Sequence, residues 1–398
     1  MGPLTGLKVL DLTHVMAGPT CTLMLADMGA DVLKVEKSPN GDDTRRMVPP
    51  LVGDEAASFL MMNRNKRGIA LDLKTPGGAA ILRRLAKSAD VLIENFGPGV
   101  LDRLGFGYEE LKAENPGLIY CSISGFGRTG PYKDRRGFDL VAQAMSGIMS
   151  FTGAGPGAAP TKCGPPLSDI TAGLLAAMGI LAAHAHRLKT GQGQMVETSL
   201  FEAALVQTYW QSAIALATGV SPGPLGSAHP LNAPYQAFEA ADGWLVVGGA
   251  NQKNWLRMLE AIGALGLAQD PRFGDNASRM ANLDALCDEL ARCFRTETVE
   301  HWLRVLDAYG VPCGPVYTMQ QALDDPQTKA REMLVEVEHS TLGTVKALGL
   351  PVKFSETPGK VRGGAPTYGQ HNHEILAEYG FTPAEIAAFQ QEGAIRAG

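Results

Sequence analysis

The chain has 398 residues, 45% of them hydrophobic and 19% charged, and its formal net charge is −6. A chain of this length can bury a large hydrophobic core and is typically divided into two domains. The acidic balance excludes the global basic field that holds nucleic acid, while leaving room for local basic residues that hold a phosphorylated small molecule.

The cysteines and the apolar runs indicate where such a protein works. The six cysteines are scattered and form no Cys-x-x-Cys pair, as is usual for thiols in a reducing compartment. Polar and charged residues interrupt the start of the chain between Thr5 and Asp11, which does not fit a secretory signal peptide. Apolar runs stay shorter than the roughly 20 residues of a membrane-spanning helix. We therefore expect a soluble, cytoplasmic protein.

Short apolar segments in the first half of the chain have the character of strands, and helical stretches separate them. These segments are residues 8–13, 31–36, 69–73, 90–94, 118–123 and 194–198. Alternation of strands and helices predicts an α/β fold with a Rossmann-like parallel sheet of the doubly wound kind. Ligands of such sheets bind at the carboxyl ends of the strands.

The residues that follow these strands are therefore candidates for ligand binding. They are His14 to Gly18, Lys37, Lys74, Asn95 to Pro98 and Ser124 to Pro131. A set of cations can converge there on phosphate groups, although any single one is more often a solvated surface residue. That set is Lys37, Lys74, Arg103 and Arg136.

A single carboxylate, Asp169, stands between a Gly/Pro-rich loop and a long apolar segment that ends near Arg187. Residues 170–183 carry no charge, which predicts a helix packed on all sides. Ser168 or Asp169 is then the expected N-cap, and capping is the ordinary role of such a residue. The alternative is a nucleophile that faces a pocket at the helix N-terminus. The Gly/Pro-rich loop favours this alternative, because capping alone does not require it.

The second half of the chain has a different character. Residues 219–230 are rich in glycine and proline and are typical of a linker or mobile loop. Two strand-like segments then flank Asp242-Gly243, which predicts a hairpin, and helices are expected over 254–262, 282–294 and 299–309. We expect a large domain over 1–220, a smaller α+β domain over 225–330, and a segment over 335–398 that returns to the large domain.

Short motifs exclude several common activities. Residues 125–130 read G-x-G-x-x-G, but Pro131 follows at once and no acidic residue ends a strand about 20 residues later, so a substrate loop fits better than a dinucleotide site. The chain lacks the phosphate-binding G-x-x-x-x-G-K-[ST] and the hydrolase G-x-S-x-G. The pairs His184/His186 and His371/His373 lack further ligands at metal spacing, so no metal site is expected.

Several stretches in one order resemble the class III CoA-transferase family, also called the CaiB/BaiF type. They are residues 6–19, 29–36, 63–67, 94–99, 124–131, 168–173 and 310–315. The resemblance extends from Gly6 to about Gly393 and is much more specific than any single motif. It implies transfer of coenzyme A between an acyl-CoA and a free carboxylic acid, with CoA as a substrate and no tightly bound cofactor.

The resemblance also implies an assembly and a site. Two chains would interlock as a homodimer, each with a large Rossmann-like domain and a small domain. Asp169 matches the nucleophile. The residues that match CoA contacts are Val15, Met16, Ala17, Lys37, Leu71, Lys74, Asn95, Phe96, Gly97, Arg103 and Arg136. The loop over 223–226 is a candidate lid, with Gly223, Gly226 and His229 on the acceptor side.

Two details bear on the substrate. Formyl-CoA:oxalate transferases resemble this chain but have glutamine where Met16 stands, which argues against oxalate. The run over 226–238 is closer to the branch that uses succinyl-CoA and dicarboxylic acids. The expected partners are an acyl-CoA, a small acid and a second copy of the chain, without nucleic acid or membrane. The alternatives are a 2-methylacyl-CoA racemase of the same fold and a protein that binds acyl-CoA without turnover.

Overall fold

The computed structural model describes residues 1–396. The chain divides into two compact units, which are interleaved along the sequence. The first unit consists of Met1–Ser146, Cys163–Gln207 and the segment that begins at Pro326, and the second consists of Gly147–Lys162 and Thr208–Asp325. The domain ranges expected from the sequence stay a prediction.

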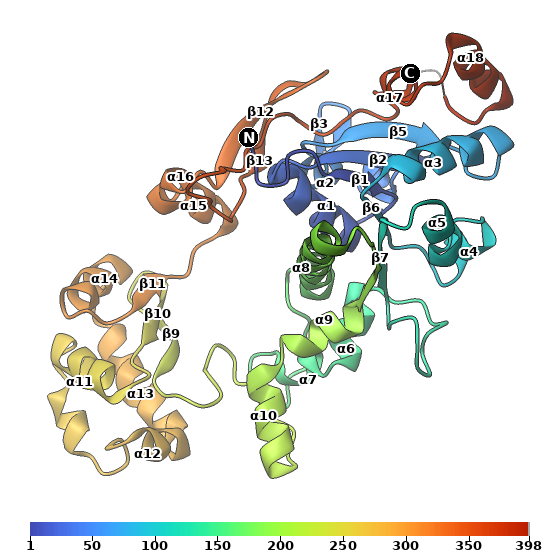
Figure 1. The fold of residues 1–398 in the computed structure, drawn as a ribbon. Coiled ribbons are helices and arrows are strands. Elements are labelled where there is room, and N and C mark those ends of the chain that lie inside the picture. Colours follow the sequence, from blue (N-terminus) through green and yellow to red (C-terminus); the bar gives the residue numbers. More distant parts are fainter. Residues whose placement is uncertain (397–398) are drawn as a thin grey trace. The chain divides into compact units, whose positions relative to one another are not determined.

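The first unit is built on one parallel sheet of six strands (Figure 1). In spatial order the strands are β5 (Arg67–Leu71), β2 (Asp31–Lys37), β1 (Lys8–Asp11), β6 (Val91–Glu94), β7 (Ile119–Ser124) and β8 (Met195–Ser199). All five pairings between neighbouring strands are parallel, and Leu10 lies opposite both Leu33 and Leu92. The predicted α/β fold with a parallel sheet is therefore confirmed.

Helices cover both faces of this sheet, because successive strand side chains point to opposite sides. Leu10, Leu33 and Leu92 pack into one apolar core with α3 (Pro76–Ser88), α5 (Tyr108–Glu114), α17 (Asn372–Glu378) and α18 (Pro383–Glu392). Asp11 points to the other face, where it accepts a hydrogen bond from Thr22 of α1 (Ala17–Asp27). The long helix α8 (Leu167–Thr190) packs beside α1 on this second face and contacts β7 and β8.

A glycine allows the close packing of α1 and α8. A Cβ atom added to Gly173 would lie 2.4 Å from the Ala17 carbonyl oxygen and 2.7 Å from Thr20 Cβ. Real Cβ atoms do not come this close to backbone, so Gly173 is required for the two helices to touch. The first turn of α8, which carries Asp169, is thereby held beside the N-terminus of α1.

The structure corrects two expectations for α8. The helix begins at Leu167, Pro166 is its N-cap, and no side chain of α8 caps it, so Asp169 lies inside the first turn and the capping interpretation was wrong. The helix is also not packed on all sides, since Leu174 and Met178 are 48% and 63% exposed in the isolated chain. Its length and mean hydropathy of 1.4 are sufficient for a membrane span by composition alone, contrary to the expectation that no apolar run is long enough.

The second unit contains a three-stranded antiparallel sheet of β9 (Tyr235–Glu239), β10 (Trp244–Gly248) and β11 (Cys313–Pro315). The predicted hairpin is confirmed, with Leu245 opposite Phe238. The helices α11 (Gln252–Ala261), α13 (Leu283–Phe294) and α14 (Val299–Ala308) pack against this sheet around buried Trp255. This core is separate from that of the first unit.

Several elements differ from the expectation or were not expected. Residues 200–218, an apolar stretch typical of one helix, form two helices, α9 (Leu200–Val206) and α10 (Tyr209–Thr218), and the boundary between the two units falls at the break. The helix α18 was missed, although Thr382 and Glu385 form a capping box with Pro383 at its first position. A hairpin of β12 (Leu334–His339) and β13 (Gly343–Leu348) lies at the start of the C-terminal segment.

The remaining helices and strands are short. They are η1 (Asp43–Arg46), β3 (Leu51–Val52), β4 (Glu55–Ala56), α2 (Ala57–Met62), α4 (Val100–Arg103), α6 (Asp139–Met145), α7 (Ile148–Phe151), η2 (Leu265–Gln269), α12 (Asn276–Ala281), α15 (Met319–Asp324) and α16 (Pro326–Ala330). Among them, η1, α4 and α6 matter for function, because they lie at or next to the carboxyl ends of the large-sheet strands.

Candidate active site

A cavity of about 390 Å³ opens in the first unit at the carboxyl ends of β1 and β6. These strands are neighbours in the sheet, and the chain continues from them in opposite directions across it, which is where open α/β sheets bind ligands. Asp169 lies in the wall of this cavity. Seven residues expected to contact CoA line it as well: Val15, Met16, Ala17, Asn95, Phe96, Gly97 and Arg136.

Four other expected CoA contacts lie outside this cavity. Lys37 lines a smaller neighbouring cavity with His14 and Phe96 and forms an ion pair of 2.7 Å with Asp43. Arg103 donates a hydrogen bond of 3.3 Å to the Pro98 carbonyl. Leu71 is buried in β5, and Lys74 is exposed just after that strand.

The three residues expected on the acceptor side belong to the second unit. The Gly226 N–H donates to the Gly153 carbonyl at 3.0 Å. The His229 ring stacks on Tyr235 with a centroid distance of 5.3 Å, and Gly223 lies in the loop between α10 and β9. Their role as a lid stays a prediction.

The Asp169 carboxylate stands alone in its wall of the cavity. Among the described residues, none donates a hydrogen bond to it or forms an ion pair with it. Burial, and then the negative charge of Asp139 on α6, raise its pKa to about 7. A partly buried carboxylate without partners, in a cavity and with a raised pKa, is a candidate for a reactive group.

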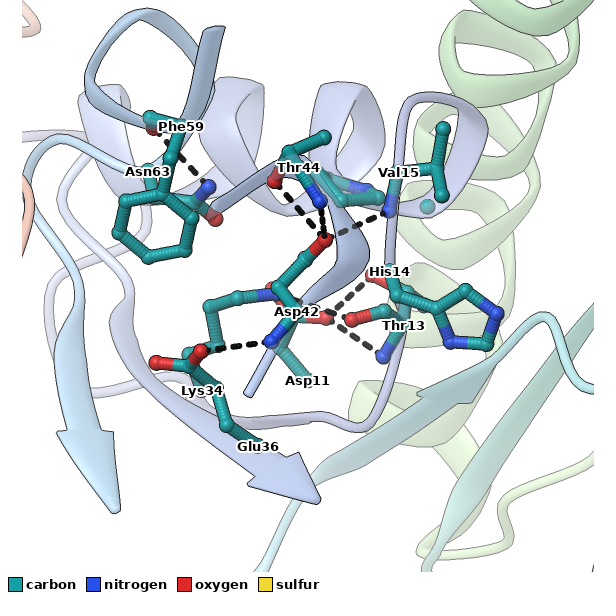
Figure 2. Close-up of polar contacts among 12 residues, drawn as sticks. Asp11, Thr13, His14, Val15, Lys34, Glu36, Asp42, Thr44, Phe59 and Asn63 are labelled. Carbon is teal, nitrogen blue, oxygen red and sulfur yellow. Dashed lines mark hydrogen bonds and ion pairs between the residues drawn. The ribbon is translucent and has the colours of Figure 1, made fainter. Parts of the chain in front are cut away.

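A buried ionic network lies beneath the loop that joins β1 to α1 (Figure 2). The Lys34 ammonium contacts the Asp42 carboxylate at 2.8 Å and donates to the Thr13 carbonyl at 2.9 Å. Asp42 in turn accepts a hydrogen bond of 3.1 Å from the Val15 N–H. Both ends of residues 13–15 are therefore held by the same ion pair.

Asp11 anchors the other side of this network. Its carboxylate accepts from the Thr13 N–H at 3.0 Å and pairs with Lys66 at 3.0 Å. Burial opposes the charge of Asp11, but Lys66 and Lys34 outweigh it and hold its pKa at about 2. Burial lowers the pKa of Lys66 to about 8 despite the attraction of Asp11.

The network supports a strained backbone at the cavity. Val15 has φ of 66°, in the left-handed region that a β-branched residue rarely adopts. Such a conformation costs about 1–3 kcal/mol and persists only where the surroundings impose it. Here the hydrogen bond to Asp42 imposes it, and it directs the following residues, Met16 and Ala17, into the cavity wall.

Asn95 joins the two loops of the cavity. Its Oδ1 accepts from the His14 N–H at 2.9 Å, and its Nδ2 donates to the His14 carbonyl at 2.8 Å. The side chain thus replaces a strand partner for His14 beyond the end of the sheet. The His14 ring lies 5.4 Å from Phe96, and burial lowers its pKa.

Sequence reasoning missed two groups of residues at this site. Asp139 was given no role, although its negative charge raises the pKa of Asp169. The partners Lys34, Asp42 and Lys66 were not identified as supports of the loop. Charged residues inside or just after apolar strands were the available signal, because a buried charge requires a partner.

Comparison with known proteins identifies the family to which the chain belongs. A family model described as CoA-transferase family III matches residues 4–372. The chain is 43% identical over 383 residues to the acetyl-CoA:oxalate CoA-transferase of Acetobacter aceti, covering 95% of this chain and 96% of that protein. It is 39% identical over 387 residues to the succinate–glutarate CoA-transferase of Agrobacterium fabrum, covering 94% and 95%.

A solved structure is similar over the same extent. The crystal structure of a CAIB/BAIF family protein from Brucella suis matches with a TM-score of 0.84 and 41% identity, covering 95% of this chain and 99% of that one. The chain therefore belongs to CoA-transferase family III, as its sequence motifs implied. It is an enzyme that transfers coenzyme A and uses CoA thioesters as substrates.

The buried network predicts a difference between two adjacent aspartates. Asp42→Asn breaks the buried ion pair of Lys34, so the free energy of unfolding should fall by about 3 kcal/mol. Asp43→Asn, which removes only the exposed pairs with Lys37 and Arg46, should change it by less than about 0.5 kcal/mol. Urea unfolding of the two variants measures both values. Equal losses would contradict a supporting role for the network.

The raised pKa of Asp169 predicts a pH-dependent stability. A carboxyl group whose pKa is higher in the folded than in the unfolded state favours folding only while protonated, so its contribution is lost as the pH rises from about 4 through 7. Asp169→Asn should therefore stabilise the ligand-free enzyme by about 2 kcal/mol at pH 8 and by much less at pH 4.5. Urea unfolding at both pH values tests this. The same gain at both would show that charge is not the cause.

Proposed function

We propose that this enzyme transfers coenzyme A from an acyl-CoA to a small dicarboxylic acid through covalent intermediates on Asp169. The observation that carries the proposal is the position of Asp169, which shares one cavity with seven of the residues expected to contact CoA and has no partner of its own. The expected contacts themselves, and the lid over 223–226, are part of the proposal.

The chemistry requires a single carboxylate. Asp169 attacks the carbonyl carbon of the donor thioester, and the C–S bond breaks to give a mixed anhydride and CoA thiolate. The thiolate attacks the aspartyl carbonyl, releasing the donor acid as a carboxylate and leaving an Asp169–CoA thioester. The acceptor carboxylate repeats the two steps in reverse order, which gives the new acyl-CoA and restores Asp169. No proton is transferred, so Asp169 has to be ionised.

The steps require stabilisation of an oxyanion and exclusion of water. Each attack generates an oxyanion, and backbone N–H groups near Gly97 and Gly125 in the wall are donors of the type that stabilise it. Water has to be kept out, because hydrolysis of an anhydride would destroy the thioester bond energy that the reaction conserves. We therefore propose that a loop closes over the cavity during turnover.

A dicarboxylic acceptor is supported by charge and by relatives. Arg135 and Arg136 line the cavity with Asp169, and neither forms an ion pair within the described part of the chain. A second carboxylate of the acceptor therefore has cations available to it. The names of the relatives include oxalate and glutarate transferases. Because one of these relatives is an oxalate transferase, oxalate stays among the proposed acceptors.

The geometry disfavours the isomerase alternative. In the racemase branch a histidine matches the position of Phe138 and forms an acid/base pair with the aspartate. Phe138 lines this cavity and is 75% exposed. A phenylalanine ring cannot carry a proton, so the cavity lacks half of that pair.

The homodimer is supported by apolar surface in both units. Leu174 and Met178 on α8 are exposed in the first unit, and α10 in the second unit exposes Tyr209, Trp210 and Leu216 and buries no residue. Helices with such apolar faces are unstable in water unless another surface covers them. A second copy of the chain, interlocked as the family resemblance implies, is the proposed cover.

Asp169→Asn tests the proposed nucleophile. The amide cannot form the anhydride, so transfer from succinyl-CoA to acids ranging from oxalate to glutarate should fall by roughly 10³-fold or more while CoA still binds. Wild-type enzyme incubated with acyl-CoA alone and then hydroxylamine should carry a hydroxamate on the Asp169 peptide, seen by mass spectrometry. Cys163→Ser is the matched control and should keep the adduct. An active Asp169→Asn enzyme, or an adduct on Cys163, would contradict the mechanism.

The assembly has a direct test. Light scattering at micromolar concentration should give twice the chain mass of 42.1 kDa, since an interlocked interface would far exceed the roughly 1,600 Å² of a standard complex. Dilution to nanomolar concentration should not dissociate it. A particle with the mass of a single chain would exclude the proposed dimer.

A further inference from the structure

Two residues of α6 hold the loop that leads into α8. The Asp139 Oδ1 accepts a hydrogen bond of 2.9 Å from the Ser168 N–H, and its Oδ2 accepts one of 2.7 Å from Gln143 Nε2. Gln143 is fully buried, and its Oε1 accepts from the Cys163 N–H at 2.9 Å. We call Asp139 and Gln143 the α6 clamp. It fixes both ends of residues 163–168, immediately before Asp169.

The clamp replaces a missing helix cap. No side chain of α8 caps its N-terminus, and the Ser168 N–H, which needs an acceptor, finds it in Asp139 on another helix. The next residue along α8 is Asp169. The position of the proposed nucleophile therefore depends on a bond made by its own neighbour in the chain.

The two carboxylates at this point have opposite surroundings. Asp139 accepts two N–H bonds, whereas Asp169 accepts none from the described residues. After burial, the charge of Asp139 is the second cause that disfavours the Asp169 anion. When two like charges share a site, the group with fewer donors binds a proton first.

Other charges around Asp169 are few. His14, Arg135 and Arg136 line the same cavity. On the helices packed against α8, Glu202 of α9 is bound by Ser199, and Asp27 of α1 is paired with Arg64. On β8, which also packs against α8, the charged residue is Glu197. Asp139 is the one of these groups that both contacts the first turn of α8 and repels the anion.

We propose that Asp139 is a positioning residue for Asp169: through the α6 clamp it fixes the first turn of α8, and its negative charge makes the Asp169 carboxylate a stronger nucleophile. The inference rests on the proposed function of Asp169. A carboxylate beside a fixed anion is more basic, and a more basic oxygen attacks a thioester carbonyl faster once it is ionised. The clamp thus combines placement and activation in one side chain.

The test compares loss of the negative charge of Asp139 with loss of the hydrogen bonds made by Gln143. The first half-reaction, formation of the Asp169–CoA thioester from acyl-CoA in a single turnover, is followed by rapid quench and mass spectrometry from pH 5 to 9. Asp139→Asn removes the charge and keeps one of the two oxygens that accept hydrogen bonds. Gln143→Leu removes the bonds to Asp139 and Cys163 and keeps the charge. Asp139→Glu keeps the charge and is the conservative control.

Each variant has a distinct expected profile. In Asp139→Asn the apparent pKa of the half-reaction should fall by about 1, and the rate above pH 8 should fall about tenfold. Gln143→Leu should lower the rate and leave the apparent pKa within about 0.3 of the wild-type value, as should Asp139→Glu. If Asp139→Asn does not fold, Asp139→Ser removes the same charge with a smaller side chain.

The outcomes separate this inference from the proposed function. An apparent pKa unchanged in both Asp139→Asn and Asp139→Ser would overturn it, and so would an equal fall in Gln143→Leu, which would assign the effect to displacement of α8. Both results are compatible with Asp169 as the nucleophile. An Asp169→Asn enzyme that still forms a CoA adduct would instead overturn the proposed function.

Discussion

The structure of the active site depends on two lysines that have no access to water. Lys34 and Lys66 lie under the β1–α1 loop. Lys34 forms an ion pair with Asp42, and Lys66 forms one with Asp11. A buried ion pair adds little net stability compared with apolar packing, because desolvation of the charges costs about as much as their attraction returns. What it does supply is position. Asp11 accepts a hydrogen bond from the Thr13 N–H, and Asp42 accepts one from the Val15 N–H. Movement of the loop would therefore break hydrogen bonds to buried charges.

The same electrostatic rule gives two aspartates of one unit opposite properties. Asp11 is buried and surrounded by donors and cations, and its pKa is about 2; Asp169 is buried without them, and its pKa is about 7. Burial acts in the same direction on both, so the partners decide the difference. The pKa values of these two aspartates thus differ because of the groups that face them.

The sequence was sufficient for the sheet, since each strand is a short apolar run and the alternation with helices indicates parallel order. It also made Asp169 a candidate, because a lone carboxylate between a Gly/Pro-rich loop and an uncharged segment is conspicuous; its role stays a proposal. The contact that holds the N-terminus of α8 was not predictable. Asp139 accepts a hydrogen bond from the N–H of Ser168, 29 residues further along the chain, and no local pattern encodes that contact. The pairing of Asp11 with Lys66, 55 residues apart, is of the same kind. The break between α9 and α10 at Gln207 was missed, because the apolar pattern of the sequence continues through it.

The edge of the large sheet has a consequence for how the chain folds as it is synthesised. β5 is the outer strand, and its Ala70 N–H donates to the Asn372 side chain, 302 residues further along, while Leu71 pairs with Ile395. An open strand edge recruits other strands, and proteins normally cover it. Here the cover leaves the ribosome last among the described segments, after the whole second unit. For most of its synthesis the nascent chain therefore carries an unprotected edge, and protection against aggregation during that interval has to come from outside the fold.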